Sequence, residues 1–498
     1  MMLIFLHQYG IYVAATFLIC YAIVRYVKSL HEPPGPLCFP FFGYLPLLFS
    51  NRRLGEIMND LAKTYGPVFQ VQYGEVVHIV LNSFEAIKEA FGRHEFSIHA
   101  PLLSSRIFVE AKEDRLIFAN GEQWRTSRKL AQHAMRIFSS SRNAALQANA
   151  SLCVTWLIKH WKDASGAPIE VKPDLRACTG ATLASLCFGT QADPSDPFLA
   201  ELSDIVHDFF ERTGGTFGLW IPDLFPSLEP LFYFKLKSAV KSYGRFVDNI
   251  WNKLLKYKPN ENVVTIADSL YKAAGEVETD KKTDKQDILK VAIDIYDAGS
   301  FTITENLEWM LGTMAAFPNI QQKVHDEIDT HVKSNEIPRL EEHWDKLHFS
   351  KACVFEVLRW VTGATFGVPR YLERDIDLLE YKLRKGCYVV ANLWAVNNDP
   401  KKFSDPLKFN PNRYINEDGT FNKILSDSLL SFSWGKRRCP GESIGKQLLF
   451  LLFTAIMQAF KIEVAPANAD LEFMKGVNFG SFIAPGSHKL ILTPRINS

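Results

Sequence analysis

The decapeptide FSWGKRRCPG, residues 432–441, precedes an apolar stretch at 444–460 that we predict to be a long helix. It places Cys439 at the amino end of that helix, beside cationic side chains and flanked by glycines. Backbone N–H groups and positive charge at such a position favour a thiolate over a thiol. A sulfur of this kind is a candidate nucleophile or metal ligand.

Spacing excludes two familiar loops. A phosphatase-type loop needs an arginine six residues after the cysteine, where this chain has Gly445. A nucleotide-binding loop needs a different glycine spacing and a Ser or Thr after its lysine, which Lys446 lacks. A metal ligand and a purely structural cysteine remain as the two alternatives.

Composition narrows the class of protein. The 498 residues include 56 Lys+Arg and 55 Asp+Glu, with 47% apolar and 22% charged residues. This excludes a disordered chain, a fibrous repeat and a strongly basic nucleic-acid binder. The 13% of aromatic residues indicates a lipophilic cavity. The eight cysteines show no C-x-x-C pair, so we predict neither a zinc site nor a disulfide framework. We predict that the protein faces a reducing compartment.

The sequence of the amino end predicts a membrane anchor. Residues 2–24 are almost wholly apolar, and about 20 such residues span a bilayer. Basic residues follow this run, whereas a cleaved signal peptide carries them before it. We therefore predict an uncleaved transmembrane signal anchor at 1–28, a proline-rich hinge at 29–40, and one large domain at 41–498 on the cytosolic side.

The domain is predicted to be mostly α-helical with small β-sheets. The pattern indicates a helix at 54–65, a hairpin of strands at 68–81 and mainly helices from 83 to 358. Short strands are expected again at 388–391 and 489–492. The charged stretch 275–286 is expected to be a solvated loop between helices.

Segment 432–441 resembles the haem-binding loop of the cytochrome P450 family, F-x-x-G-x-R-x-C-x-G. Phe432, Gly435, Arg437, Cys439 and Gly441 match every fixed position, and the resemblance extends over nearly the whole chain. It implies a cytochrome P450-type catalytic domain that binds haem b, with the Cys439 thiolate as the axial iron ligand. It also implies that Phe432 packs near the sulfur and that Arg437 pairs with a haem propionate.

Two further segments resemble the family's propionate partners. Trp124 and Arg128 match W-x-x-x-R, and their spacing of four puts both on one helix face. Arg370, which follows Val368-Pro369, resembles another propionate-binding arginine.

Glu356 and Arg359 match the family's E-x-x-R pair on a helix with apolar neighbours, which indicates burial. In the family this pair forms a network with a downstream arginine, which Arg413 resembles. The resemblance assigns these three residues to folding and haem-pocket integrity, not to catalysis.

Residues 298–302, Ala-Gly-Ser-Phe-Thr, resemble the family's A-G-x-[D/E]-T helix that crosses over the haem. The resemblance gives Thr302 a catalytic role in proton delivery. The acidic position, however, is Phe301. Water, Asp297 or Glu305 could take over proton delivery from the missing acid. Alternatively, the reaction needs no proton by this route. The purely structural interpretation is that Phe301 packs outside the groove.

The resemblance places the substrate pocket among apolar side chains, for which the candidates are Phe108, Phe301, Phe366, Phe479 and Phe482. Each of these rings is alternatively part of the core. Segments 223–226 and 232–234 are candidates for dipping into the membrane.

The expected function is that of a microsomal haem-thiolate monooxygenase similar to animal steroid and xenobiotic hydroxylases. It inserts one atom of dioxygen into a lipophilic small molecule (a steroid, fatty acid or xenobiotic), using electrons from an NADPH-cytochrome reductase in the endoplasmic reticulum membrane. Cytochrome b5 is a second candidate partner, and no nucleic acid is expected. Lys129, Lys436, Arg438 and Lys446 form either a basic docking surface or a solvated face.

Two other functions remain open from the sequence. One is a haem-thiolate isomerase or dehydratase of a lipid hydroperoxide or endoperoxide, which Phe301 favours. The other is a membrane-anchored haem protein that catalyses nothing.

Overall fold

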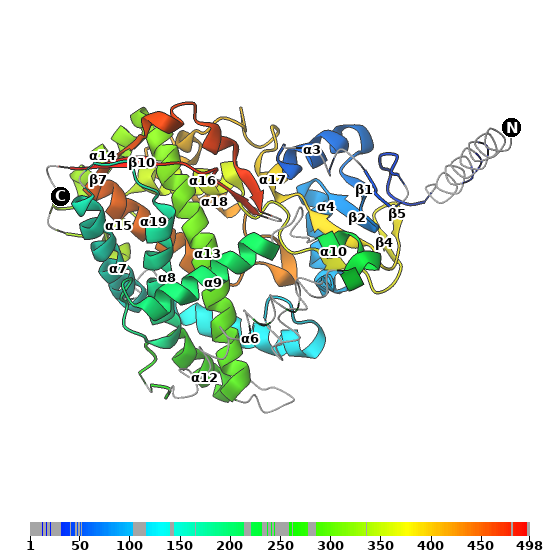
Figure 1. The fold of residues 1–498 in the computed structure, drawn as a ribbon, viewed down its shortest axis with the longest axis horizontal. Helices are drawn as coiled ribbons and strands as arrows, with labels where there is room; N and C mark the ends of the chain where they lie inside the picture. The colour runs from blue at the N-terminus through cyan, green and yellow to red at the C-terminus, as the bar shows by residue number, and fades with distance from the viewer. Residues whose placement is uncertain are drawn as a thin grey trace.

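A computed structural model of the chain (Figure 1) describes residues 12, 16, 20, 31–39, 41–44, 47, 50, 52–102, 116–139, 144–164, 166–213, 221–231, 237, 241, 244, 258–260, 262–276, 285–334, 336–479 and 482–495. For 208–213, 221, 222, 285, 286 and 479 it describes the backbone alone.

The α-helices are α3 (Leu54–Tyr65), α4 (Phe84–Gly92), α6 (Gly121–Ile137), α7 (Ala144–Asp163), α8 (Lys172–Phe188), α9 (Pro197–Thr213), α10 (Ile221–Leu224), α12 (Ile266–Glu276), α13 (Lys285–Ala316), α14 (Pro318–His331), α15 (Leu340–His343), α16 (His348–Val361), α17 (Leu393–Asn397), α18 (Lys423–Asp427) and α19 (Glu442–Ala459). Short 3₁₀ turns are η1 (His94–Ser97), η3 (Pro226–Leu228), η4 (Pro411–Tyr414), η5 (Gly435–Arg437), η6 (Pro466–Asn468) and η7 (Glu472–Lys475).

The strands are β1 (Val68–Tyr73), β2 (Val76–Leu81), β3 (Arg370–Tyr371), β4 (Ile376–Leu378), β5 (Tyr381–Leu383), β6 (Tyr388–Ala391), β7 (Phe460–Val464), β8 (Val477–Phe479), β9 (Phe482–Ala484) and β10 (Leu490–Pro494). One sheet has four strands in the order β1-β2-β6-β3, with β2 and β6 parallel and Val80 opposite Val390. Three two-stranded sheets pair β4 with β5, β7 with β10, and β8 with β9.

Two helices that are buried over most of their length and a long central one build the core. Helix α13 runs through the middle of the body, and α8, α9 and α19 lie around it (Figure 1). Helices α8 and α19 are buried nearly all round, as helices without a polar face must be. Gly299 permits the close contact of α13 with α8, because a Cβ there would lie 3.0 Å from Leu183 Cδ1.

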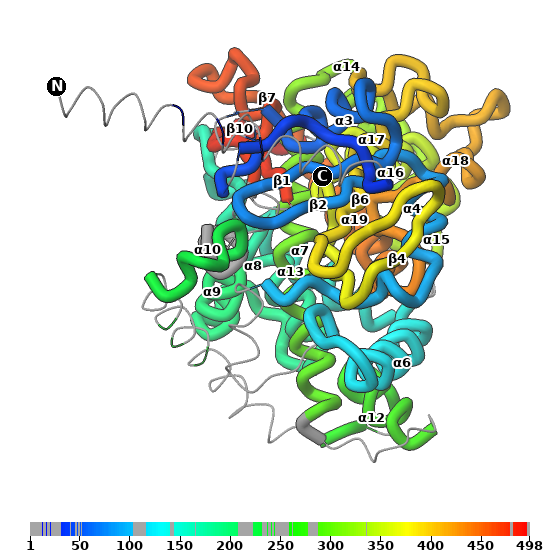
Figure 2. Tube along the Cα trace, turned by 90° about the vertical axis from the view of Figure 1, so that its right-hand side faces the viewer, coloured from blue at the N-terminus to red at the C-terminus, as the bar shows by residue number. Residues whose placement is uncertain are grey.

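The four-stranded sheet, with α3 and α17 beside it, forms a second region with its own hydrophobic clusters. Figure 2 shows this region at the end of the molecule opposite α6 and α12. The Cys439 loop has to connect the two regions, since α19 belongs to the helical body and η5 packs on α4.

The prediction of a mostly helical domain with small sheets is confirmed. The helix at 54–65, the hairpin at 68–81 and the strand at 388–391 appear with the expected bounds. Strands β3, β4, β5, β7, β8 and β9 were not predicted. They are two to five residues long, too short for a periodic pattern to show.

The segment 223–226 does not dip into a membrane as predicted, since Leu224 and Phe225 are buried. The Leu224 carbonyl accepts a hydrogen bond from the Glu75 N–H at 2.7 Å, and the Phe225 ring lies 5.1 Å from that of Phe41. The other candidate, 232–234, lies outside the described residues, as does nearly all of the predicted anchor. No helix within the described ranges is long and apolar enough to cross a membrane.

A buried ion-pair network fastens α16 to the segment around η4. Arg359 donates two hydrogen bonds to the Glu356 carboxylate, at 2.7 and 2.9 Å, and Arg413 Nε donates a third at 3.2 Å. The side chains of Glu356 and Arg359 are 0% exposed. The backbone carbonyls of Asn397 and Pro406 and the side-chain oxygen of Asn398 accept the remaining Arg359 donors, so the buried cation is fully hydrogen-bonded.

Glu356→Gln should lower the free energy of unfolding by about 3–5 kcal/mol, because it leaves Arg359 and Arg413 buried without a counter-charge. Urea unfolding of the full-length protein, followed by circular dichroism, measures this. The matched control is Glu342→Gln, which breaks the exposed pair with Arg339 and should cost at most about 1 kcal/mol. Equal losses in both variants would show that the buried network adds nothing.

Candidate active site

The Cys439 loop is a strained turn held against α4. Ser433 and Gly435 have φ angles of 65° and 76°, in the left-handed region. The Cys439 N–H donates to the Phe432 carbonyl at 2.9 Å and closes the loop. Gly435 is required for close approach, since a Cβ there would lie 2.0 Å from the Phe91 carbonyl oxygen.

The sequence-based prediction of an intrinsically stabilised thiolate at Cys439 is corrected by its surroundings. The side chain is solvent-accessible, yet it lies deep enough that burial raises the pKa of the thiol above its ordinary value, and Glu442 adds to this. The Gly441 backbone, Arg128 and Arg438 act in the opposite direction without reversing it. A thiolate here therefore requires a further positive charge such as a metal ion, as for other cysteine ligands.

Three arginines from three distant segments converge near the loop. Arg437 Nε and Nη2 donate to the Ser97 and Ala119 carbonyls at 2.8 and 2.7 Å. Arg128 Nη2 donates to the Arg438 carbonyl at 2.6 Å, and Arg370 Nη1 donates to the Val368 carbonyl at 3.1 Å.

Trp124 and Arg128 are both buried on one face of α6, as their spacing predicted. The guanidinium of Arg437 stacks 3.8 Å from the Trp124 ring centroid. The α6 helix therefore contributes two side chains to the arginine cluster.

This cluster carries more positive charge than its surroundings neutralise. Burial lowers the pKa of Arg370 and of Arg437 to about 9, and repulsion among the arginines adds to the shift. Arg128 Nε, Arg370 Nε and Arg437 Nη1 are buried without a hydrogen-bond partner. In the described part of the chain, no carboxylate forms an ion pair with any of the three. A cofactor with two carboxylates, such as haem, fits these donors, and Cys439 supplies a ligand for its metal.

The face of α13 that carries Thr302 is half-exposed although the helix is interior. Ile295, Ala298, Gly299, Thr302 and Asn306 form this stripe at helical spacing. Thr302 Oγ1 donates to the Ala298 carbonyl at 2.8 Å, and the Thr302 carbonyl accepts from Asn306 Nδ2 at 2.7 Å. Thr302 is thus the hydroxyl on the half-exposed face of α13.

Phe301 lies outside this stripe. Its side chain is 2% exposed, and its ring lies 5.4 Å from that of His207 and 5.3 Å from that of Phe482. Glu305, one turn later on the same face, is buried and paired with Lys172 at 2.8 Å. Asp297 is also buried, beside Cys187.

Comparison with known proteins identifies the family. The chain matches the cytochrome P450 family over residues 33–491. The chain belongs to the cytochrome P450 family. It is similar to cytochrome P450 1A1 of Cavia porcellus, with 28% identity over 454 residues that cover 88% of this chain and 87% of the relative. Cytochrome P450 1A5 of Gallus gallus is 27% identical over 478 residues, covering 91% and 88%. Human cytochrome P450 1A2 is 27% identical over 458 residues, covering 89% and 88%.

Membership of the cytochrome P450 family gives the protein its class and cofactor. It is a monooxygenase, an oxidoreductase that uses haem with an axial cysteine thiolate. The cluster of unpaired guanidinium donors beside an accessible cysteine is the geometry that such a cofactor needs.

The structure distributes the predicted pocket residues of this cytochrome P450 unevenly. Phe301 and Phe482 are in contact, and Ala364 forms a backbone bridge with Phe482. Phe366 lies in the separate cluster beside the four-stranded sheet. Phe479 pairs through its backbone with Phe482, while its side chain and all of Phe108 lie outside the described residues.

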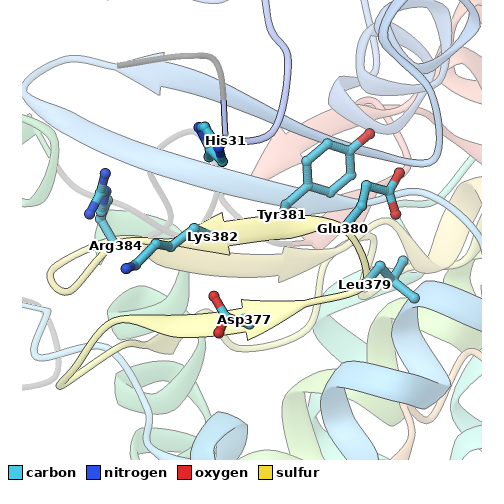
Figure 3. Close-up of a pocket in the computed structure, with 7 residues that line it drawn as sticks. All are labelled: His31, Asp377, Leu379, Glu380, Tyr381, Lys382 and Arg384. Atoms are coloured by element: carbon cyan, nitrogen blue, oxygen red, sulfur yellow. The ribbon is translucent and has the colours of Figure 1, made fainter. Parts of the chain in front are cut away.

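A surface hollow of about 520 Å³ lies between the segment at His31 and the β4–β5 hairpin. Figure 3 shows Tyr381 and Lys382 on β5 of this hairpin, Arg384 just beyond the strand, and His31 above it. Its lining carries charges of both signs, and it includes none of the residues predicted to bind haem and not Thr302.

Sequence reasoning missed His99 and Asn120, which both join the arginine cluster. His99 contacts Arg370, and Asn120 Oδ1 accepts from Arg437 Nη2 at 2.8 Å. No local pattern marks either residue, because their role depends on contacts with segments hundreds of positions away.

Gly435→Ala should reduce the haem bound per protein molecule at least severalfold, because an alanine there overlaps the Phe91 carbonyl and adopts a positive φ. The haem-to-protein absorbance ratio after purification measures this. Gly445→Ala is the control: nothing lies within 4 Å of its Cβ position, so full haem content is expected. Normal haem content in Gly435→Ala would show that the loop tolerates displacement.

Proposed function

We propose that this cytochrome P450 is a membrane-anchored monooxygenase of the endoplasmic reticulum. It inserts one atom of dioxygen into a lipophilic small molecule, a steroid, fatty acid or xenobiotic, with electrons that an NADPH-cytochrome reductase supplies. The observation that carries the proposal is the accessible Cys439 beside three arginines, each of which has one buried nitrogen without an acceptor.

In this proposal each side chain of the site has a defined task. Cys439 is the axial ligand, and Phe432 packs near its sulfur; Arg128, Arg370 and Arg437 pair with the propionates, while Trp124 supports Arg437. When bound, the haem supplies the activation of dioxygen. The ion-pair network that fastens α16 stabilises the fold around the haem pocket; its members are Glu356, Arg359 and Arg413.

Thr302 holds a proton at Oγ1 on the half-exposed face of α13. Its hydroxyl donates to the Ala298 carbonyl in this structure, so the oxygen retains lone pairs that can accept from water. When the hydroxyl turns from the Ala298 carbonyl to the site, it can donate its proton there and take one back from water, which is general acid work. Phe301 supports the proposed pocket from the core side, through its contact with Phe482.

The proposed domain division is the anchor at 1–28, the hinge at 29–40 and the catalytic domain at 41–498, which faces the cytosol. Leu37, Phe39, Phe41 and Phe42 are 40–80% exposed within six residues, just after the proposed anchor. Such a cluster of exposed apolar side chains fits a surface that rests on lipid.

The reductase, and cytochrome b5 as a second donor, are proposed to meet the surface near the Cys439 loop. Lys129, Lys436 and Arg438 are exposed there. Lys446, however, is largely buried, and it shares Glu442 with Arg438. The docking surface therefore carries less free positive charge than the sequence indicated.

The family favours this function over the hydroperoxide isomerase and the non-catalytic haem protein. Incorporation of labelled oxygen from dioxygen into product distinguishes the monooxygenase from the isomerase.

Reduction of the membrane-bound protein by NADPH and its reductase under carbon monoxide should produce a strongly red-shifted Soret band, because the thiolate remains the axial ligand. Cys439→Ser should abolish that band, whereas Cys387→Ser, which replaces a buried cysteine outside the loop, should retain it. A band that forms with dithionite and not with NADPH and reductase would refute the proposed electron donor while leaving the haem site intact.

Thr302→Ala should retain haem and the red-shifted band yet lower the product formed per NADPH severalfold, because it removes the distal hydroxyl; positioned acids contribute roughly 10²–10⁴-fold to proton transfer. Product, NADPH and hydrogen peroxide are measured with whichever of a steroid, a fatty acid and a planar aromatic compound is turned over. Thr304→Ala is the control, since its hydroxyl faces Thr179 on α8. Full coupling in Thr302→Ala would contradict the distal assignment.

A further inference from the structure

His99 is a buried histidine that the mechanism above leaves without a role. It lies in the segment after η1, is 5% exposed and forms a backbone bridge with Arg370. Its ring contacts two groups: Nδ1 lies 2.5 Å from the Ile117 carbonyl oxygen, and Nε2 contacts Arg370 Nη1.

These two partners assign the tautomer. A carbonyl oxygen can only accept, so Nδ1 carries the proton, and a guanidinium can only donate, so Nε2 accepts. A doubly protonated ring would place two donors against each other at Arg370. Burial and the charges of Arg370 and Arg437 agree, since they hold the pKa of His99 well below its ordinary value.

The contact with His99 restricts the orientation of the Arg370 guanidinium. Nη1 is shared between His99 Nε2 and the Val368 carbonyl, and the group lies 4.8 Å over the Phe91 ring. Arg370 Nε remains buried without a hydrogen-bond partner. His99 thus occupies one edge of the guanidinium and leaves another donor available for an anion.

His99 is itself held by the segment that connects the other parts of the site. The backbone N–H of His99 donates to Asn120 Oδ1 at 2.9 Å, and the same oxygen accepts from Arg437 Nη2. The N–H of Ile117 donates to Asp294 Oδ2 on α13 at 3.3 Å. Residues 117–120 therefore join His99 to the Cys439 loop on one side and to α13 on the other.

We propose that His99 is a positioning residue for the haem: as a neutral imidazole, it orients the guanidinium of Arg370 toward a propionate and couples it to the segment 117–120. The inference rests on the proposed haem site. It differs from the family-derived assignments because His99 acts through Arg370 as a hydrogen-bond acceptor and not as a cation that binds the propionate itself.

Two variants separate the contacts of His99. In His99→Asn, the side-chain amide takes the place of Nδ1, so it keeps the donor to Ile117 and loses the acceptor for Arg370. In His99→Gln, the terminal oxygen reaches the place of Nε2 and keeps the acceptor. The readout is the rate at which the full-length, detergent-solubilised protein loses haem to apomyoglobin.

We expect His99→Asn to lose haem about tenfold faster than the wild type, the usual cost of removing an outer-sphere partner, and His99→Gln to stay within about twofold. The carbon monoxide band should keep its position in both, because Cys439 is untouched. In an Arg370→Gln background, His99→Asn should add less than about twofold, since the two side chains act as a unit. His325→Asn, which removes another buried histidine contact, to the Phe460 carbonyl, is the control.

Haem loss at the wild-type rate in His99→Asn, or an undiminished effect of that change in the Arg370→Gln background, would overturn the inference. If His99→Asn does not fold, His99→Gln decides alone: near-wild-type haem loss supports the role, and a tenfold acceleration refutes it. A wild-type protein that binds no haem would instead refute the proposed function on which the inference rests.

Discussion

The mutual repulsion of three clustered guanidiniums is the constraint on which the site depends. Arg128 and Arg370 are buried and Arg437 is partly buried, and no described carboxylate pairs with any of them. The protein tolerates this arrangement because backbone carbonyls accept part of each guanidinium's donors. The donors that remain are matched by the two carboxylates of a haem, so binding of the cofactor relieves a cost that folding alone leaves in place.

The fold explains how such distant residues come together. The loop of Cys439 connects the helical body to the sheet region, α6 brings Trp124 and Arg128 from one side, and β3 brings Arg370 from the other. Helix α13 contributes its half-exposed stripe, which carries Thr302. The Glu356 network, by contrast, fastens α16 to the segment around η4 with its charges paired, so the electrostatic imbalance is confined to the site.

Local patterns allowed much of this to be predicted. Helix α3, the β1–β2 hairpin and β6 follow from periodicity and turn residues, and the spacing of Trp124 and Arg128 gave their common face. What could not be predicted depends on the tertiary environment. Burial outweighs the cations around Cys439, the acidic residue missing at 301 is replaced by aromatic packing, and His99 meets Arg370 only once β3 is in place.

The arginines of this site are held mainly by the main chain, through the carbonyl groups of Ser97, Ala119, Val368 and Arg438. Every amino acid carries that same acceptor. The residues at these four positions can therefore diverge in evolution without loss of the hydrogen bonds, provided that the course of the backbone is kept. The anion-binding geometry is in this respect a property of the chain path, and it can persist between proteins that share little more than a quarter of their sequence.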